Sequence, residues 1–83
     1  NNQRKHGISF EEAQSIFYDP NARITSDPEH YDAEERYVLL GVSERFRILT
    51  VVHCYRKNES VIRIISARKA TRKEQKYYEE HLP

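Results

Sequence analysis

The fold is decided by residues 61–80, which read Val61-Ile-Arg-Ile-Ile-Ser-Ala-Arg-Lys-Ala-Thr-Arg-Lys-Glu-Gln-Lys-Tyr-Tyr-Glu-Glu80. The first half is rich in β-branched residues and predicts a strand, and the second half predicts a helix that follows it directly. Six cations crowd around this junction: Arg63, Arg68, Lys69, Arg72, Lys73 and Lys76. Positive charge is unfavourable at a helix N-terminus, because the helix dipole favours anions there. A bound phosphate would offset this cost, so the junction is the first place to look for a functional site.

The composition of the chain limits its class. Its 83 residues predict a single domain over residues 1–83, and its net charge of +1 excludes a globally basic nucleic-acid-binding protein. Any attraction to phosphate must therefore come from local patches. The single cysteine, Cys54, excludes an internal disulfide and fits a reducing compartment. Because no signal peptide or membrane span is recognisable, we expect a cytoplasmic protein without a membrane partner.

Helix signals occur at three places. Gly7 follows Arg4-Lys5-His6 and is typical of the residue just past a helix C-terminus, so we expect the chain to begin inside a helix and to lack preceding residues. Ser9-Phe-Glu-Glu12 is a capping box that opens a second helix, which Asp19-Pro20 ends. Thr71-Arg-Lys-Glu74 is another capping box, which opens a last helix that reaches about His81.

Strand signals fill most of the middle of the chain. A short strand is expected near Ala22–Thr25, followed by an acidic loop and by strands at Arg36–Ser43, Arg47–Tyr55 and Ser60–Arg68. The short turns between the last three predict an antiparallel meander. We therefore expect an α+β fold, with a small twisted antiparallel sheet that helices cover mainly on one face. Both faces are largely apolar, so part of one face is left for a missing segment, a partner or a substrate.

The alternation of side chains gives approximate faces of this sheet. Symmetric hairpins would place His53 and Arg68 on one face and Arg63 on the other. A slip of one residue in either turn would reverse the relative assignment.

Arg63 and Arg68 are the leading candidates for a functional site. Arg63 interrupts an apolar strand, and is either a rim residue whose stem covers apolar surface or a guanidinium that grips a phosphate. Arg68 ends the same strand and can point toward the helix start. The lysines and arginines beyond it form a run that is usually a solvated face, so they are weaker candidates.

The histidines and tyrosines admit more than one interpretation. His53 lies among apolar residues, where a histidine is often structural, but it would suit proton transfer if it shared a groove with Arg68. One of Tyr77 and Tyr78 should pack on the sheet, and the other is left to stack on a base or to face solvent. Asp27, Glu29, His30 and Asp32 lack any recognised ligand spacing, so we expect no metal and no cofactor.

Two blocks resemble a known family: Lys5-His-Gly-Ile-Ser-Phe-Glu-Glu-Ala13 and Arg63-Ile-Ile-Ser-Ala-Arg-Lys-Ala70. Further matches are Asp19-Pro20, Glu35-Arg-Tyr37, Gly41, Val51-Val-His53, Glu74 and Tyr78. Together they are similar to BrnT proteins, the toxins of bacterial type II toxin–antitoxin pairs. The resemblance covers nearly the whole chain, but the N-terminal strand and most of the first helix of that family are absent, so we expect this domain to be N-terminally incomplete.

The resemblance implies a RelE-like fold, endoribonuclease activity that blocks translation, and a BrnA-like antitoxin that forms a hetero-oligomer with the toxin and mediates any contact with DNA. We predict a metal-independent endoribonuclease, in which Arg63 and Arg68 clamp phosphate and His53, or in second place His6, transfers protons. The predicted RNA contacts are Lys5, Arg36, Lys69, Arg72, Lys73 and Tyr78. The alternative is a non-catalytic module that binds RNA or a protein through the same basic surface.

Overall fold

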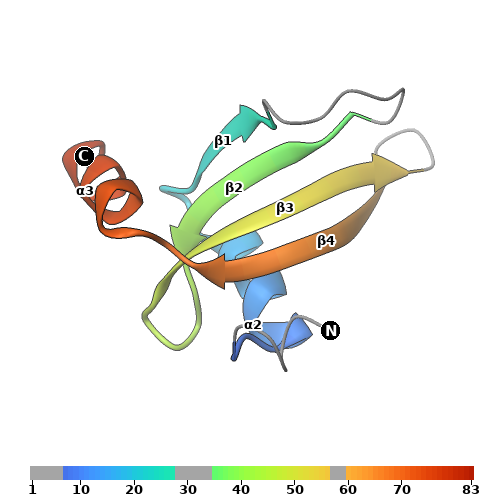
Figure 1. Ribbon diagram of the computed structural model, residues 1–83, viewed down its shortest axis with the longest axis horizontal. Coiled ribbons are helices and arrows are strands. Elements are labelled where there is room, and N and C mark those ends of the chain that lie inside the picture. The colour runs from blue at the N-terminus through green and yellow to red at the C-terminus, as the bar shows by residue number, and fades with distance from the viewer. Residues whose placement is uncertain (1–6, 28–34, 57–59) are drawn as a thin grey trace.

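The computed structural model describes residues 7–27, 35–56 and 60–83 (Figure 1). A short helix α2 (Phe10–Ser15) continues into the 3-10 turn η1 (Ile16–Tyr18). Strands β1 (Arg23–Ser26), β2 (Tyr37–Val42), β3 (Ile48–Arg56) and β4 (Val61–Lys69) follow, and helix α3 (Arg72–Glu80) ends the order of elements. The predicted order of these elements is confirmed, whereas the helix expected before Gly7 lies outside the described residues. Within the described part of the chain, no helix has the length and apolarity that a membrane crossing requires.

The four strands form one antiparallel sheet in the order β1-β2-β3-β4, as expected for a meander. Helices lie on both of its faces, rather than mainly on one. Against one face, α2 and η1 build a core of Ile8, Ala13, Ile16, Leu39, Leu49, Val51 and Ala67. Against the other face, Tyr78 of α3 packs in a smaller cluster with Leu40 of β2 and with Ala70, which lies between β4 and α3. We call these the α2 face and the α3 face.

A β-bulge in β4 changes which residues share a face. Val52 pairs with Ser66 while the next residue, His53, pairs with Ile64, so Ile65 is the extra residue. Side chains beyond this point are shifted by one position relative to a regular hairpin. The predicted pairing of His53 with Arg68 on one face is therefore wrong: the shift brings Arg68 to the face of Arg63 instead.

The two capping boxes differ in the structure. At α3, Thr71 accepts from the backbone N–H of Glu74 and the Glu74 carboxylate accepts from the N–H of Thr71, so the predicted box is confirmed. At α2, Ser9 Oγ accepts from the N–H of Glu12 at 3.0 Å, but the carboxylate of Glu12 turns inward. Only half of the first box is formed.

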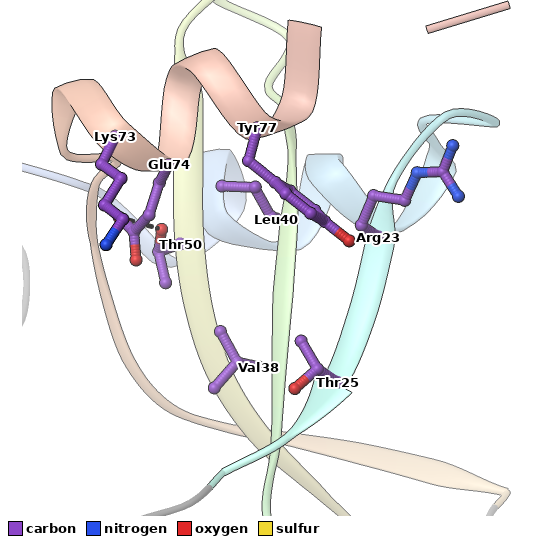
Figure 2. A pocket seen from close by; sticks show the side chains of 8 residues that line it. All are labelled: Arg23, Thr25, Val38, Leu40, Thr50, Lys73, Glu74 and Tyr77. Carbon is purple, nitrogen blue, oxygen red and sulfur yellow. Dashed lines mark hydrogen bonds between the residues drawn. The ribbon is translucent and has the colours of Figure 1, made fainter. Parts of the chain in front are cut away.

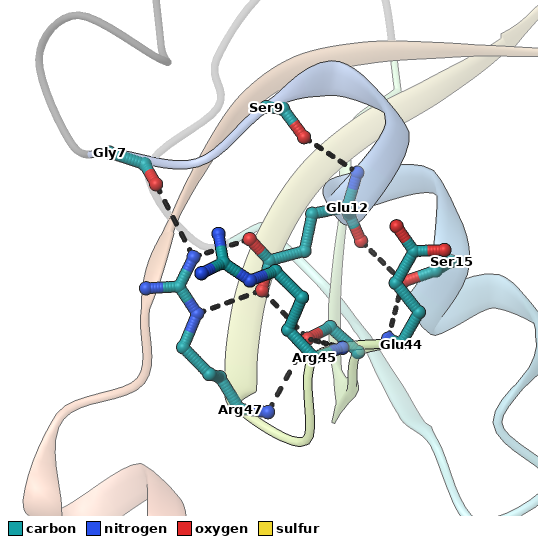
Figure 3. Close-up of polar contacts among 8 residues, drawn as sticks. Gly7, Ser9, Glu12, Ser15, Glu44, Arg45 and Arg47 are labelled. Carbon is teal, nitrogen blue, oxygen red and sulfur yellow. Dashed lines mark hydrogen bonds and ion pairs between the residues drawn. The ribbon is translucent and has the colours of Figure 1, made fainter.

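The inward-turned Glu12 is 1% exposed and anchors a polar network beneath α2 (Figure 3). Its carboxylate accepts from Ser43 Oγ at 2.7 Å and from Arg47 Nε at 2.9 Å, and a second bond joins it to Arg47 Nη2. Arg47 also donates to the carbonyl of Gly7 at 3.3 Å. The network connects the start of α2 to the β2–β3 turn. Its hydrogen bonds also compensate the negative charge of Glu12, which would otherwise be costly to bury.

Asp19 fastens the end of η1 to the rest of the domain. Its side chain accepts from the backbone N–H of Asn21 and of Val42, both at 2.9 Å, and from the hydroxyl of Tyr78. Beside it, a Cβ at Gly41 would lie 3.2 Å from Cβ of Ala22, which is tighter than an ordinary contact, so a larger residue at that point of β2 would have to displace its neighbours slightly. These contacts fix where α3 lies on its face of the sheet.

Candidate functional site

The junction of β4 and α3 is held by an ion pair between Arg68 and Glu74. The guanidinium donates to both carboxylate oxygens, at 2.8 and 3.0 Å, and Thr50 Oγ1 donates to the same carboxylate at 3.0 Å. The hydrogen bonds from Arg68 lower the pKa of Glu74 to about 2, so the carboxylate is ionised at neutral pH. The chain thus supplies an anion of its own at the cation-rich helix start, where the sequence alone had suggested a phosphate.

A groove runs over the α3 face beside this ion pair, and we call it the sheet groove. Its two connected hollows, of about 430 and 270 Å³, share Thr25, Val38, Thr50 and Glu74 as lining residues. The first hollow is also lined by Ser26, Asp27, Val52 and Arg68. The second is also lined by Arg23, Leu40, Lys73 and Tyr77 (Figure 2). Three arginine and lysine side chains and two carboxylates therefore border an otherwise apolar or hydroxyl-lined surface.

The structure brings some of the predicted cations to this face and places others elsewhere. Arg68 and Lys73 line the sheet groove directly. Arg63 pairs with Cys54, and Arg68 pairs with Thr50. These two partners lie four residues apart on β3, so strand alternation places both arginines on the α3 face, about 14 Å apart. Lys69 pairs with Leu49 and so alternates to the α2 face. Arg72 is exposed in the first turn of α3.

Arg36 directly precedes β2. Its carbonyl accepts from the N–H of Asp27 at 3.0 Å, which places Arg36 near the end of the groove that Asp27 lines. Its Nε is buried and has no hydrogen-bond partner among the residues that the structure describes. The two other predicted residues, Lys5 and His6, lie outside the described residues.

His53 lies on the α2 face and is fully buried. Its ring contacts the rings of Phe17, Tyr37 and Tyr55 at centroid distances of 4.9, 6.0 and 5.2 Å, and Nε2 lies 3.2 Å from the hydroxyl of Tyr55. Burial lowers the pKa of His53 below its usual value. The sheet separates this histidine from Arg68. Of the two interpretations that the sequence left open for His53, the geometry therefore favours the structural one.

This position predicts a pH dependence of stability. The buried imidazole resists protonation, whereas His53 in the unfolded chain takes up a proton near pH 6.5. Its contribution to stability is therefore complete above pH 6.5 and is lost as the pH falls toward the lower pKa of the folded state. We expect the midpoint of urea unfolding to fall between pH 7.5 and 5.5, and to fall less in a His53→Gln variant.

The carboxylates provide a natural control for this measurement. The pKa values of Glu12, Asp19 and Glu74 are all lowered from ordinary values near 4. Their contributions are present above pH 4.5 and are lost only as the pH falls below it. An equal loss of stability in His53→Gln and the wild type between pH 7.5 and 5.5 would show that His53 is not the titrating group.

The two tyrosines of α3 have different environments. Tyr78, the predicted RNA contact, is 5% exposed, and burial together with its bond to Asp19 raises the pKa of its hydroxyl to about 12. Tyr77 is 47% exposed and lines the sheet groove. The structure thus gives Tyr78 a packing role and leaves Tyr77 as the tyrosine open to a ligand.

Sequence reasoning did not name Arg23, Thr50 or Glu74 as site residues; it assigned Glu74 to a cap and to the family resemblance. Arg23 lies in a strand with no apolar pattern and reaches the groove only because β1 pairs with β2. A signal for Glu74 was present, since an acidic residue one turn into a helix can reach back to a cation at the preceding strand end.

The fold and the site define a class of protein: a small α+β domain with a cation-bordered groove over one face of an antiparallel sheet. A family model described as "Ribonuclease toxin, BrnT, of type II toxin-antitoxin system" matches residues 1–74. The chain therefore belongs to the BrnT family of ribonuclease toxins. Membership makes RNA the target and an antitoxin protein the partner. A search of curated proteins found no match to the chain.

Proposed function

We propose that this toxin is a metal-independent endoribonuclease that inhibits translation, and that it binds RNA in the sheet groove, with Arg68 and Arg63 as its phosphate clamps. The observation that carries the proposal is the position of Arg68, whose guanidinium is fixed by Glu74 at the border of a groove that crosses an open sheet face. A guanidinium oriented in advance stabilises developing negative charge without reorganising during the reaction.

Arg68 has donors to spare for a phosphate. Arg68 directs Nη1 and Nη2 to Glu74, and Nη1 also donates to the carbonyl of Lys69 at 3.3 Å. A guanidinium carries five N–H groups, so within the described part of the chain Nε and one N–H of Nη2 remain for a second acceptor. Arg63 lies about 14 Å further along the strand, so the two side chains suit neighbouring positions of an extended RNA strand rather than one shared atom.

The arginines would supply the electrostatic role that a metal ion has in other nucleases. In such a reaction the 2′-hydroxyl attacks the adjacent phosphorus, the bond to the 5′-oxygen breaks, and a 2′,3′-cyclic phosphate forms. The cations stabilise the pentavalent phosphorane. Of the two histidines predicted for proton transfer, His6 remains our candidate, since His53 is buried on the opposite face.

The second candidate function is binding without cleavage through the same groove. It is favoured by the same ion pair, because Glu74 already neutralises much of the charge of Arg68. The partner protein we propose is a BrnA-like antitoxin, on the strength of the family assignment. Co-expression with the product of an adjacent antitoxin gene should restore growth, and co-purification should recover both chains.

Incubation of the purified protein with end-labelled RNA in EDTA separates the two functions. We expect discrete fragments that end in 2′,3′-cyclic phosphate, and no cleavage where the nucleotide on the 5′ side is 2′-deoxy. RNA that is retarded on a native gel but stays intact would support the binding module. Fragments that form only with added divalent ions would contradict metal independence.

A further inference from the structure

The second hollow of the sheet groove is built around the exposed ring of Tyr77. The His81 ring lies beside it, with a centroid distance of 4.1 Å and an angle of 37° between the planes. The backbone holds this pair in place, because His81 Nδ1 lies 2.7 Å from the carbonyl of Tyr77 and Arg23 Nη2 donates to the carbonyl of His81 at 2.6 Å. Tyr77 is therefore an exposed aromatic ring with restrained surroundings.

The walls of this hollow suit a flat, uncharged ring. Figure 2 shows the Tyr77 side chain extending from α3 beside Leu40 of β2, with Val38 and Thr25 further along the sheet. The two threonine hydroxyls that line it already donate within the protein, Thr50 to Glu74 and Thr25 to the carbonyl of Ser26. The surface beside Tyr77 is thus mostly apolar, while charged groups lie at its borders.

Those charges favour a polyanion over an uncharged ligand. Arg23 and Lys73 border the apolar hollow, and Arg68 borders the first hollow, which continues from it across Thr25, Val38 and Thr50. The two carboxylates of the groove, Glu74 and Asp27, leave the three cations in excess. An apolar slot beside a cationic position matches the repeating chemistry of single-stranded RNA, a base followed by a phosphate.

We propose that this slot is a nucleobase-binding subsite, in which the base adjoining the phosphate at Arg68 stacks on Tyr77 over Leu40 and Val38. The inference rests on the proposed function and adds the element that positions the RNA strand. Base stacking on an aromatic side chain is tolerant of sequence, because every base has a π-face, so the subsite aligns the strand more than it selects a base.

The test compares Tyr77→Ala with wild type on two RNA oligonucleotides, one complete and one with a single abasic nucleotide beside the cleaved phosphate. The abasic position is placed on the 5′ side and on the 3′ side in turn. On the complete RNA we expect Tyr77→Ala to raise KM about tenfold or more, while Tyr77→Phe, which keeps the ring, stays near wild type. On the abasic RNA that lacks the stacked base, the KM of the wild type should rise by the same factor. On that RNA, Tyr77→Ala should not raise KM further.

Two controls make this test decisive. Tyr18→Ala removes a tyrosine that is 83% exposed on η1, at the α2 face, and should leave both substrates unaffected. Urea unfolding of each variant checks that α3 stays packed. If Tyr77→Ala lowers kcat/KM equally on complete and abasic RNA, its role is structural and the subsite is wrong.

The proposed subsite and the proposed ribonuclease activity can be tested independently. If wild type binds RNA without cleaving it, the same comparison is made with dissociation constants, and a loss confined to complete RNA still supports stacking on Tyr77. If the folded wild type neither cleaves nor binds single-stranded RNA, the subsite is overturned together with the proposed function.

Discussion

Arg68→Gln should lower the rate of RNA cleavage by about 100-fold or more, the effect typical of removing a donor that stabilises transition-state charge. It should also abolish growth arrest when the toxin is induced. The fold should survive, because Glu74 is partly exposed and keeps its bonds from Thr50 and Thr71. The ion pair that is lost is screened by solvent, and such pairs contribute about 1 kcal/mol or less to stability. Cleavage assays and unfolding curves on the same preparation provide the measurement.

Glu74→Gln is the informative companion to this variant, since it breaks the same ion pair but keeps the cation. We expect it to retain at least tenfold more activity than Arg68→Gln, whose lost donors are those proposed to contact the phosphate. Arg45→Gln removes an exposed arginine of the β2–β3 turn and should behave as wild type. Equal losses in Arg68→Gln and Glu74→Gln would mean that the pair acts only to hold α3. Full toxicity of a folded Arg63→Ala/Arg68→Ala variant would contradict the assignment outright.

Arg47→Ala should destabilise the domain by about 3 kcal/mol. This value is at the low end of the cost of breaking a buried ion pair, because the side chain of Arg47 is itself 27% exposed. The cause is the carboxylate of Glu12, whose pKa is lowered chiefly by its bond with Arg47 and which would be left buried with Ser43 as its remaining side-chain donor. For a small domain this is a large share of the total free energy of unfolding. Urea unfolding monitored by circular dichroism measures it.

Two further variants identify the source of this effect. Arg45→Ala removes a neighbouring exposed cation that makes only a minor electrostatic contribution at Glu12, and it should cost little. The double variant Glu12→Leu/Arg47→Met removes both charges and should recover much of the lost stability. If Arg47→Ala costs no more than Arg45→Ala, the network in Figure 3 does not stabilise the fold as described.

The sequence was sufficient for the order of elements but not for the faces of the sheet. Caps and apolar periodicity are local signals, which is why the start of α3 at Thr71 and the meander could be predicted. The bulge at Ile65 has no such signal, because Ile64, Ile65 and Ser66 all suit a regular strand. That single extra residue separated His53 from Arg68 and placed Arg68 on the face of Arg63.

The tyrosines show the same limit for a helix. Tyr77 and Tyr78 differ by about 100° around α3, so the angle at which the helix docks decides which of them is buried. That angle is set by distant contacts, above all the bond between Tyr78 and Asp19, which are 59 residues apart in the chain. Only the structure could assign Tyr78 to the core and Tyr77 to the groove.

The claim that RNA binds on the α3 face is tested most directly by an NMR titration with an uncleavable 2′-O-methyl RNA. The largest changes in backbone amide shift should occur at Thr25, Thr50, Arg68 and Tyr77, which line the sheet groove. A separate hollow on the α2 face is lined by Phe10, Gln14, Phe17, Tyr18, Ile62 and Ile64, and the amides of these residues should change little. Shifts concentrated at Phe10, Tyr18 and Ile62, with the sheet groove unaffected, would contradict the account.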